Sequence, residues 1–332
     1  MDSLTQIVLG IATAEAVAGK QLRNRTFLYG AILGTLPDLD VIFGRWLSPI
    51  DVVAFHRGVS HSLLFFIVMA PLLGALIHRW ERPKLSFQRS SWMVFLVLLT
   101  HALLDLFTTW STQFLWPLSQ RFAWKTIFVI DPLYTLPFIF CLWMVWKNKL
   151  HERRKLWVWR GIGISTTYLM LTVALKLIAV HQFEKALDNQ GIVYEGLIVK
   201  PSPLNCILWN ANVKTTEGFL LADYALTDSS EITFTPVKTS SENYPEVRVS
   251  EDYQKLLEIT EGWYVMAQEK GRWVMHDLRF GFFDSYNQLP VFAISYEFYQ
   301  NGEGTLSARE ASKEQLDGKA MLKNIGLRIL GK

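Results

Sequence analysis

Three short motifs place histidine and aspartate inside otherwise apolar stretches of the chain. They read Pro-Asp-Leu-Asp at 37–40, His-Arg-Gly-Val-Ser-His at 56–61 and His-Ala-Leu-Leu-Asp at 101–105. Ionisable side chains are costly in an apolar setting unless a partner compensates them, and a shared metal ion satisfies imidazole and carboxylate groups together. We therefore predict a metal site with the ligands Asp38, Asp40, His56, His61, His101 and Asp105.

The spacing within these motifs limits which side chains can meet. His101 and Asp105 are four residues apart and therefore share one face of a helix. Asp38 and Asp40 are two residues apart and would diverge in a regular helix. Pro37 either loosens the backbone enough for both carboxylates to reach one site or leaves Asp40 to support a ligand from outside. The sequence leaves both alternatives open.

The predicted ligand types indicate which metal and which chemistry to expect. Mixed imidazole and carboxylate ligands favour zinc, with manganese or iron as alternatives. Six such side chains suffice for one ion or for two ions that share a carboxylate, and paired ions are typical of phosphoester chemistry. Two further residues are predicted to be catalytic: Arg57, as the binding group for a substrate anion, and Asp131, which alternatively caps a helix starting at Pro132. The alternative to a metal site is a purely structural polar network.

Apolar runs that approach the roughly 20 residues needed to cross a bilayer predict an α-helical polytopic membrane domain. Four runs are long and strongly apolar, and two weaker ones lie near the N-terminus. The earlier of these carries Glu15 but is rich in small residues, which let membrane helices approach closely; its alternative is an interfacial or re-entrant helix. The six predicted spans are 4–18, 27–44, 62–78, 91–109, 127–146 and 161–180.

The distribution of basic residues between the predicted spans predicts their orientation. Segments 19–26, 79–90 and 147–160 hold 13 Lys and Arg residues, whereas segments 45–61 and 110–126 hold four. Because cytoplasmic loops carry the excess of basic residues, the first set is predicted to be cytoplasmic. Six spans then place the N-terminus, the three motifs and the C-terminal half at the outer face.

The C-terminal half is predicted to be a separate soluble domain. Residues 1–180 contain 18 basic and nine acidic residues, and residues 181–332 contain 15 and 21, so the slightly basic total does not indicate a nucleic-acid surface. Helices are predicted at 251–260 and 307–327. Short runs that alternate apolar and polar residues predict a mainly β, α+β domain, with strands at Ile192–Val199, Glu231–Val237, Gly262–Gln268, Arg272–Phe280 and Pro290–Tyr299. Gln268–Gly271 is predicted to be a hairpin turn.

The motifs together resemble a known family. Met1–Gln6, Gly34–Asp40, Phe55–Ser62 and His101–Asp105 are similar to the YdjM-like family of bacterial membrane proteins, which are described as membrane-bound metal-dependent hydrolases. The resemblance implies a multi-pass protein of the bacterial cytoplasmic (inner) membrane and a divalent metal cofactor. Many members carry histidine where this chain has Gln6, so one candidate ligand is missing here.

These observations predict a metal-dependent hydrolase whose site opens at the outer membrane face, with water as the nucleophile. The depth of the motifs favours a membrane lipid or a lipid-linked phosphoester as substrate. Two alternatives remain at this point: a transporter of metal ions or protons, and a membrane-anchored binding module with a structural metal.

Overall fold

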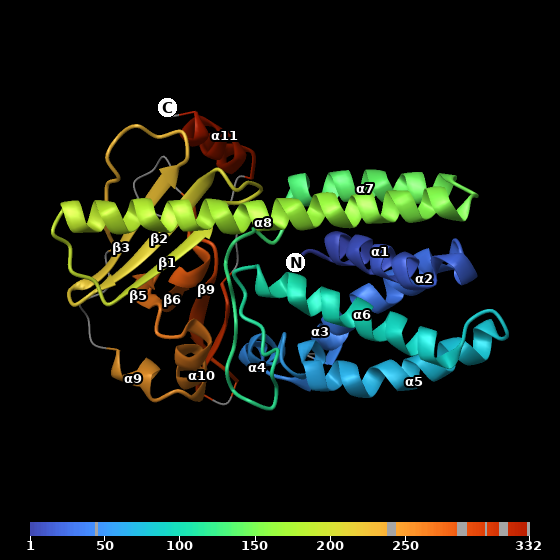
Figure 1. The fold of residues 1–332 in the computed structure, drawn as a ribbon. Coiled ribbons are helices and arrows are strands. Elements are labelled where there is room, and N and C mark those ends of the chain that lie inside the picture. Colours follow the sequence, from blue (N-terminus) through green and yellow to red (C-terminus); the bar gives the residue numbers. More distant parts are fainter. Residues whose placement is uncertain (44–45, 238–243, 284–290, 303, 312–317, 331–332) are drawn as a thin grey trace. The chain divides into compact units, whose positions relative to one another are not determined.

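The computed structural model describes residues 1–43, 46–237, 244–283, 291–302, 304–311 and 318–330 (Figure 1). The chain divides into two compact units. The first comprises Met1–Phe43, Phe55–Ala174 and Pro203–Asn205, and the second comprises Gly44–Ala54, Leu175–Ser202 and Cys206–Lys332. The division after Ala174 and the predicted domain boundary at 180 both fall inside one long helix, His151–Asn189.

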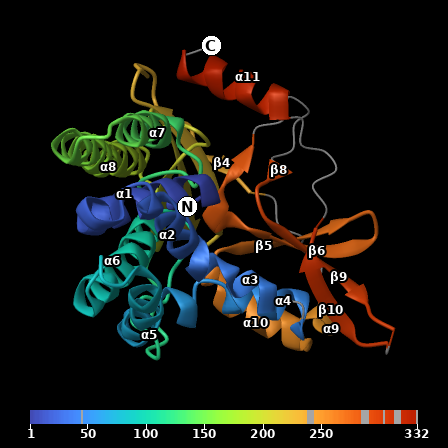
Figure 2. The ribbon, with the colours of Figure 1, turned by 90° about the vertical axis from the view of Figure 1, so that its right-hand side faces the viewer.

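The first unit is helical, as the apolar runs predict. Figure 2 looks along its helices, and Figure 1 shows α5 and α6 side by side as an antiparallel pair. Its elements are α1 (Ser3–Leu22), α2 (Arg25–Thr35), η1 (Leu36–Leu39), α3 (Asp40–Phe43), η3 (Val59–His61), α5 (Leu63–Glu81), α6 (Phe87–Leu106), α7 (Pro132–Lys147) and the first part of α8 (His151–Asn189).

The predicted span at 27–44 is broken into three elements. Helix α2 ends at Thr35, the 3-10 helix η1 follows with Pro37 in its first turn, and α3 begins at Asp40. Proline lacks an N–H and clashes with the preceding turn, so the α-helical hydrogen bonding cannot continue unchanged through this point. The backbone stays helical through this point, since Thr35, Leu36 and Asp40 all keep right-handed helical φ and ψ.

Helices α1 and α2 approach each other through glycines. A Cβ atom placed on Gly10 would lie 2.4 Å from the carbonyl oxygen of Gly30, and one placed on Gly34 would lie 2.7 Å from the carbonyl oxygen of Gln6. Small residues permit this separation because no side chain stands between the two backbones. The contact fixes α2, and therefore η1, against the N-terminal helix.

Glu15 is compensated within the first unit. Its Oε1 and Oε2 accept hydrogen bonds of 2.8 Å from Nε and Nη2 of Arg154 on α8, and Thr26 donates to Oε2 at 2.5 Å. This two-pronged ion pair supplies both charge and hydrogen bonds to a carboxylate that is only 5% exposed. A charge inside α1 is therefore compatible with an apolar surrounding.

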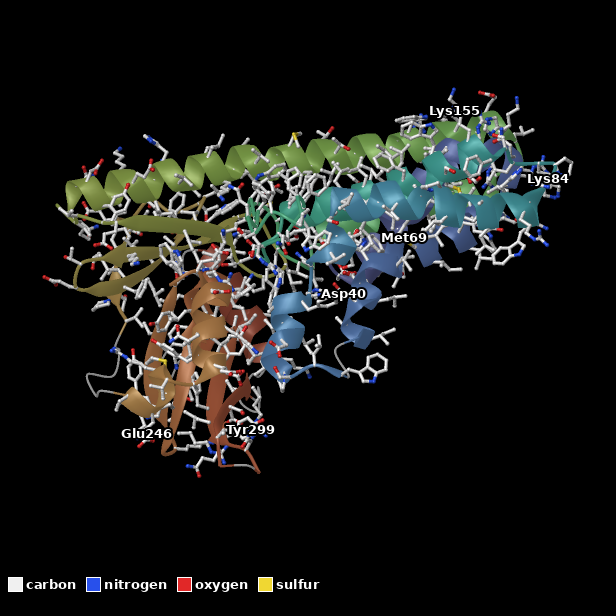
Figure 3. All side chains as sticks on the ribbon, turned by 90° about the horizontal axis from the view of Figure 1, so that it is seen from below. Asp40, Met69, Lys84, Lys155, Glu246 and Tyr299 are labelled. Atoms are coloured by element: carbon white, nitrogen blue, oxygen red, sulfur yellow. The ribbon has the colours of Figure 1, made fainter. Side chains whose placement is uncertain are left out.

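Three helices within the described residues are long and apolar enough to cross a membrane, namely α5, α6 and α8. Helix α7 is apolar but shorter. The ends of these helices that face the loops 82–86 and 148–150 carry exposed tryptophans: Trp80, Trp92, Trp146 and Trp159. Lys84 and Lys155 lie at the same end of the helices in Figure 3, away from Asp40. Tryptophans at the ends of apolar helices are typical of a membrane–water interface.

The second unit contains the predicted β-rich region. Its sheets have the strand orders β1-β2-β3-β4, β10-β9-β6-β5 and β7-β8, and the paired strands are antiparallel. The strands are β1 (Gly196–Pro201), β2 (Leu208–Thr215), β3 (Gly218–Ala225), β4 (Thr235–Pro236), β5 (Tyr264–Glu269), β6 (Arg272–Asp277), β7 (Phe282–Phe283), β8 (Val291–Phe292), β9 (Ser295–Gln300) and β10 (Leu306–Glu310). The helical elements are α4 (Pro49–Phe55), α9 (Pro245–Arg248), α10 (Glu251–Thr260), η4 (Leu278–Phe280), α11 (Gly318–Ile329) and the end of α8.

The predicted hairpin turn is confirmed. Strands β5 and β6 pair from Glu269 opposite Arg272, and Lys270 and Gly271 between them have φ of 48° and 76°. Two consecutive positive φ values match the twist of the flanking strands. Glycine adopts this conformation without strain, which explains why the turn is visible in the sequence.

Of the other predictions for the second unit, some are confirmed and some are wrong. Helix α10 covers the predicted 251–260, but residues 307–310 form part of β10 where a helix was predicted. These residues pair with β9 instead of forming a helix, and this pairing buries Ala308 in the core. Residues 312–317 of that predicted helix, and Pro290 of a predicted strand, lie outside the described residues. Strands β2 and β3 were not predicted.

The glycine contact between α1 and α2 gives a testable prediction. Gly30→Ala is expected to destabilise the first unit by about 1–3 kcal/mol, because the new Cβ would lie 2.4 Å from Cα of Ile11 and backbone must move. Gly163→Ala is the matched control, since a Cβ there meets nothing within 4 Å. Thermal unfolding of both purified variants in detergent measures the difference. Equal transition temperatures would contradict the close contact.

Candidate metal centre

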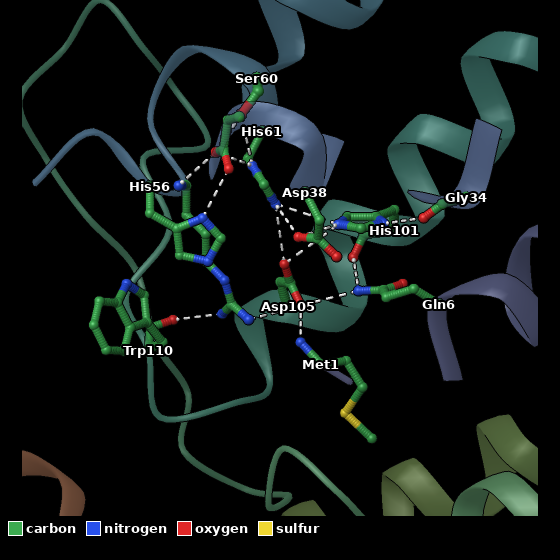
Figure 4. Close-up of polar contacts among 12 residues, drawn as sticks. Met1, Gln6, Gly34, Asp38, His56, Ser60, His61, His101, Asp105 and Trp110 are labelled. Carbon is green, nitrogen blue, oxygen red and sulfur yellow. Dashed lines mark hydrogen bonds and ion pairs between the residues drawn. The ribbon is translucent and has the colours of Figure 1, made fainter. Parts of the chain in front are cut away.

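Four of the predicted ligands converge at one end of the helices of the first unit. Their ligand atoms all lie within 4.8 Å of one another. Residue 38 comes from η1, residue 61 from η3, and residues 101 and 105 from α6, so three separate segments build the cluster (Figure 4). We call this cluster the His/Asp group; it consists of Asp38, His61, His101 and Asp105.

A hydrogen bond fixes which nitrogen of His101 faces the group. Its Nδ1 lies 2.7 Å from the carbonyl oxygen of Gly34. A carbonyl oxygen only accepts hydrogen bonds, so Nδ1 carries a proton, and Nε2 is the ring nitrogen that faces the group. That Nε2 lies 3.2 Å from Nε2 of His61.

His61 is oriented in the same way by a serine. The hydroxyl of Ser60 donates to Oδ2 of Asp40 at 2.8 Å, so its oxygen is available to accept from Nδ1 of His61, 2.9 Å away. His61 is fully buried. Both imidazoles therefore use Nδ1 for support and turn Nε2 inward, as metal-binding histidines do.

The two carboxylates bring further acceptors to the same point. Oδ1 of Asp38 lies 3.3 Å from Nε2 of His61 and 3.5 Å from Nε2 of His101. Oδ2 of Asp105 lies 3.4 Å and 3.6 Å from the same two atoms. This Oδ2 is buried and has no hydrogen-bond partner among the described residues. Four electron-pair donors thus face one another.

Five of the six separations between ligand atoms fit a tetrahedral metal site, and the sixth, between the two carboxylates, is within 4.8 Å. Zinc holds nitrogen and oxygen ligands at about 2.0–2.2 Å, which separates neighbouring ligands by about 3.3–3.6 Å. The separations between the two Nε2 atoms, and from each of them to the two carboxylates, run from 3.2 to 3.6 Å. The donor set and its spacing therefore fit a divalent ion.

Asp105 is held by its other oxygen. Oδ1 accepts from Nε2 of Gln6 at 3.0 Å, pairs with Nη2 of Arg57 at 3.2 Å and contacts the Met1 amine. Thr108 accepts from Nη1 of Arg57 at 2.9 Å. Arg57 is buried and oriented toward a member of the His/Asp group, and its predicted role in binding a substrate anion stays a prediction. Gln6 takes a supporting position here.

The other two predicted ligands lie beside the group. Asp40 accepts hydrogen bonds from the backbone N–H of Arg57 at 3.2 Å and from Ser60, and its Oδ1 lies 2.9 Å from Nδ1 of His56. Asp40 supports His61 through Ser60, which is the outside position left open by the sequence. Asp40 follows Asp38 by two residues along helical turns, so its side chain leaves the backbone in a different direction.

Asp131, the second predicted catalytic residue, caps α7. Its Oδ1 accepts from the backbone N–H groups of Leu133 and Tyr134, at 2.9 and 3.3 Å, and the hydroxyl of Tyr168 donates to Oδ2 at 2.9 Å. These bonds account for both oxygens. This geometry is that of a helix cap, the alternative that the sequence offered for Asp131.

The sequence did not identify two supporting groups. One is the Gly34 carbonyl, which has no side-chain signal. The other is Ser60, which lies inside the second motif. Its position directly before His61 is the available signal, since a hydroxyl there reaches the neighbouring ring and Asp40 together.

The fold and the His/Asp group describe a helical membrane protein with a buried cluster of metal-ligand side chains and a β-rich second unit. The model of the family described as YdjM inner membrane protein matches residues 1–179, and the chain belongs to this family. The inner membrane protein YbcI of Escherichia coli (strain K12) is 34% identical over 145 residues, which cover 41% of this chain and 82% of the relative. No solved structure matches the chain. With the apolar helices, these similarities identify an inner membrane protein.

Removal of one ligand tests the centre. His101→Ala is expected to lower the content of zinc, manganese or iron in the purified protein at least tenfold, because it removes one of four converging donors. His78→Ala is the control, since that ring bonds the Leu85 carbonyl outside the His/Asp group. Elemental analysis by mass spectrometry measures the metal. An unchanged content in His101→Ala, or no metal in the unmodified protein, would refute the centre.

Proposed function

We propose that this protein is a metal-dependent hydrolase whose site is the His/Asp group with one divalent ion, zinc in the first place. The observation that carries the proposal is the pair of inward-facing Nε2 lone pairs, set by the Nδ1 hydrogen bonds of His61 and His101. In this tautomer, the two Nε2 lone pairs and the two carboxylates repel one another across 3.2–3.6 Å. A cation supplies the missing attraction.

A divalent ion at this point would activate water and polarise the substrate's oxygen. The chain's own residues hold the donors in place. The Gly34 carbonyl and Ser60 fix the rings, and Arg57 holds one oxygen of Asp105 so that the other points into the group. The charges of the ion and Arg57 exceed those of Asp38 and Asp105, which favours an anionic substrate such as a phosphoester.

The hydrolase proposal is tested on a phosphoester. Purified protein with zinc or manganese is expected to release p-nitrophenol from p-nitrophenyl phosphate, and His101→Ala to lower kcat/KM at least 100-fold, because the ion is lost. His78→Ala is expected to retain activity. Turnover that persists in His101→Ala, or after chelation, would refute the proposal. Metal uptake into vesicles without any turnover would favour a transporter instead.

We also propose that the chain crosses the membrane six times and that the His/Asp group and the second unit lie outside the cytoplasm. Support comes from the 13 basic residues in alternate connecting segments and from the exposed tryptophans at the helix ends that carry them. Helices α1 and α2–α3 would be the two additional, less regular spans.

Reporter fusions test this orientation. Alkaline phosphatase fused after residue 330 is expected to be active, because the enzyme requires the oxidising space outside the cytoplasm. The same reporter fused after Lys84, in a basic loop, is expected to be inactive and serves as the control. The reverse pattern, with activity only at Lys84, would contradict the proposed topology.

A further inference from the structure

The His/Asp group is open to its surroundings at one of its four members. The side chains of His61, His101 and Asp105 are at most 1% exposed, whereas that of Asp38 is 19% exposed. A substrate that reaches the group must therefore approach along η1, the element that carries Asp38. The surface around η1 decides which class of substrate is accepted.

That surface is apolar. Leu39, Val41 and Ile42, which follow Asp38 on η1 and α3, are 40%, 51% and 47% exposed. A site for a small water-soluble anion is ordinarily reached through polar or basic surface, which steers the ligand. Exposed branched side chains beside the accessible ligand instead favour a substrate with an apolar portion.

The elements on either side of the group continue into lipid-facing surface. Helix α5 begins two residues after His61, and its exposed Leu64, Ile67 and Val68 belong to a helix long and apolar enough to span the membrane. Asp105 is the residue before the last of α6, the second such helix. The ends of membrane spans lie at the level of the lipid headgroups, which is where lipid phosphates are found.

We propose that the substrate is the phosphoester headgroup of a membrane lipid, which enters from the bilayer along η1 and α3 while its chains stay against the apolar surface. This inference rests on the proposed hydrolase function. For a phosphatidic acid, water oxygen forms a bond to phosphorus and the bond from phosphorus to the glycerol oxygen breaks. The leaving oxygen takes a proton from the water, and the products are diacylglycerol and inorganic phosphate.

Two substrates that share a glycerol phosphate group, one a lipid and one soluble in water, test whether the acyl chains are recognised. The zinc-loaded or manganese-loaded full chain is assayed with didecanoyl phosphatidic acid in mixed micelles and with glycerol 3-phosphate in the same micelles. We expect kcat/KM to be at least about tenfold higher for the lipid, because the apolar surface contributes binding only to its chains. Equal or better turnover of glycerol 3-phosphate would overturn the inference and leave the hydrolase function intact.

A matched pair of variants tests the route. Ile42→Gln is expected to raise KM for didecanoyl phosphatidic acid about fivefold, because it removes apolar contact, and to leave kcat and turnover of glycerol 3-phosphate unchanged. Leu133→Gln is the control, since Leu133 is similarly exposed, at 56%, in the first turn of α7. Equal KM values for the two variants would refute entry along α3.

A binding measurement is independent of turnover. Phosphatidic acid with a diazirine in its acyl chain, in nanodiscs, is expected to label residues 36–42 and 63–68, as mapped by mass spectrometry. Unlabelled phosphatidic acid should suppress this labelling, and diacylglycerol should not. Equal suppression by both would overturn the inference. If neither substrate is hydrolysed, the hydrolase function fails, and this headgroup-specific labelling decides the inference alone.

Discussion

The hydrogen bond from Nδ1 of His101 to the carbonyl oxygen of Gly34 determines the chemistry of the centre. It joins α6 to the end of α2 and directs Nε2 toward the other three members of the His/Asp group. It is available because α2 is held in place by its glycine contact with α1, in which the Gly10 and Gly30 backbones nearly touch. Small residues far from any ligand atom therefore set the position of the carbonyl that orients the ring.

Buried carboxylates in the first unit are compensated by ion pairs and hydrogen bonds from nearby side chains. Asp105 shares Oδ1 with Arg57 and Gln6, and Glu15 is matched by a two-pronged pair with Arg154. In each case the partner also donates hydrogen bonds, which compensates the loss of water better than charge alone. Oδ2 of Asp105 is one of several buried side-chain atoms without a hydrogen-bond partner among the described residues. Because this oxygen lies 3.4 and 3.6 Å from the two Nε2 atoms of the His/Asp group, its position fits that of a metal ligand.

The second unit is stabilised independently of these charges. Its sheets are antiparallel, and a separate core gathers around Met266, Met275 and Tyr296 on strands β5, β6 and β9, with Ile50 from α4. Arg279 and Asp277, at the end of β6, form a buried pair at 2.7 Å. Its hairpin turn and α10 were readable from local sequence because each depends on neighbouring residues. The helix prediction was wrong for residues 307–310, because their pairing with β9 is a tertiary contact that outweighs a helix-like composition.

The sequence by itself determined the residue types of the centre, the helical membrane character of the first unit and the β-rich character of the second. Motif spacing and the distribution of apolar residues carry this information along the chain. Only the tertiary structure decided which predicted ligands meet. Asp38 joins the group and Asp40 supports it, because residues two apart on helical turns point in different directions and the packing against α6 brings Asp38 to His101. Similarly, His61 reaches the centre whereas His56 pairs with Asp40. Side-chain direction after a break in a helix depends on backbone packing, which spacing in the sequence does not encode.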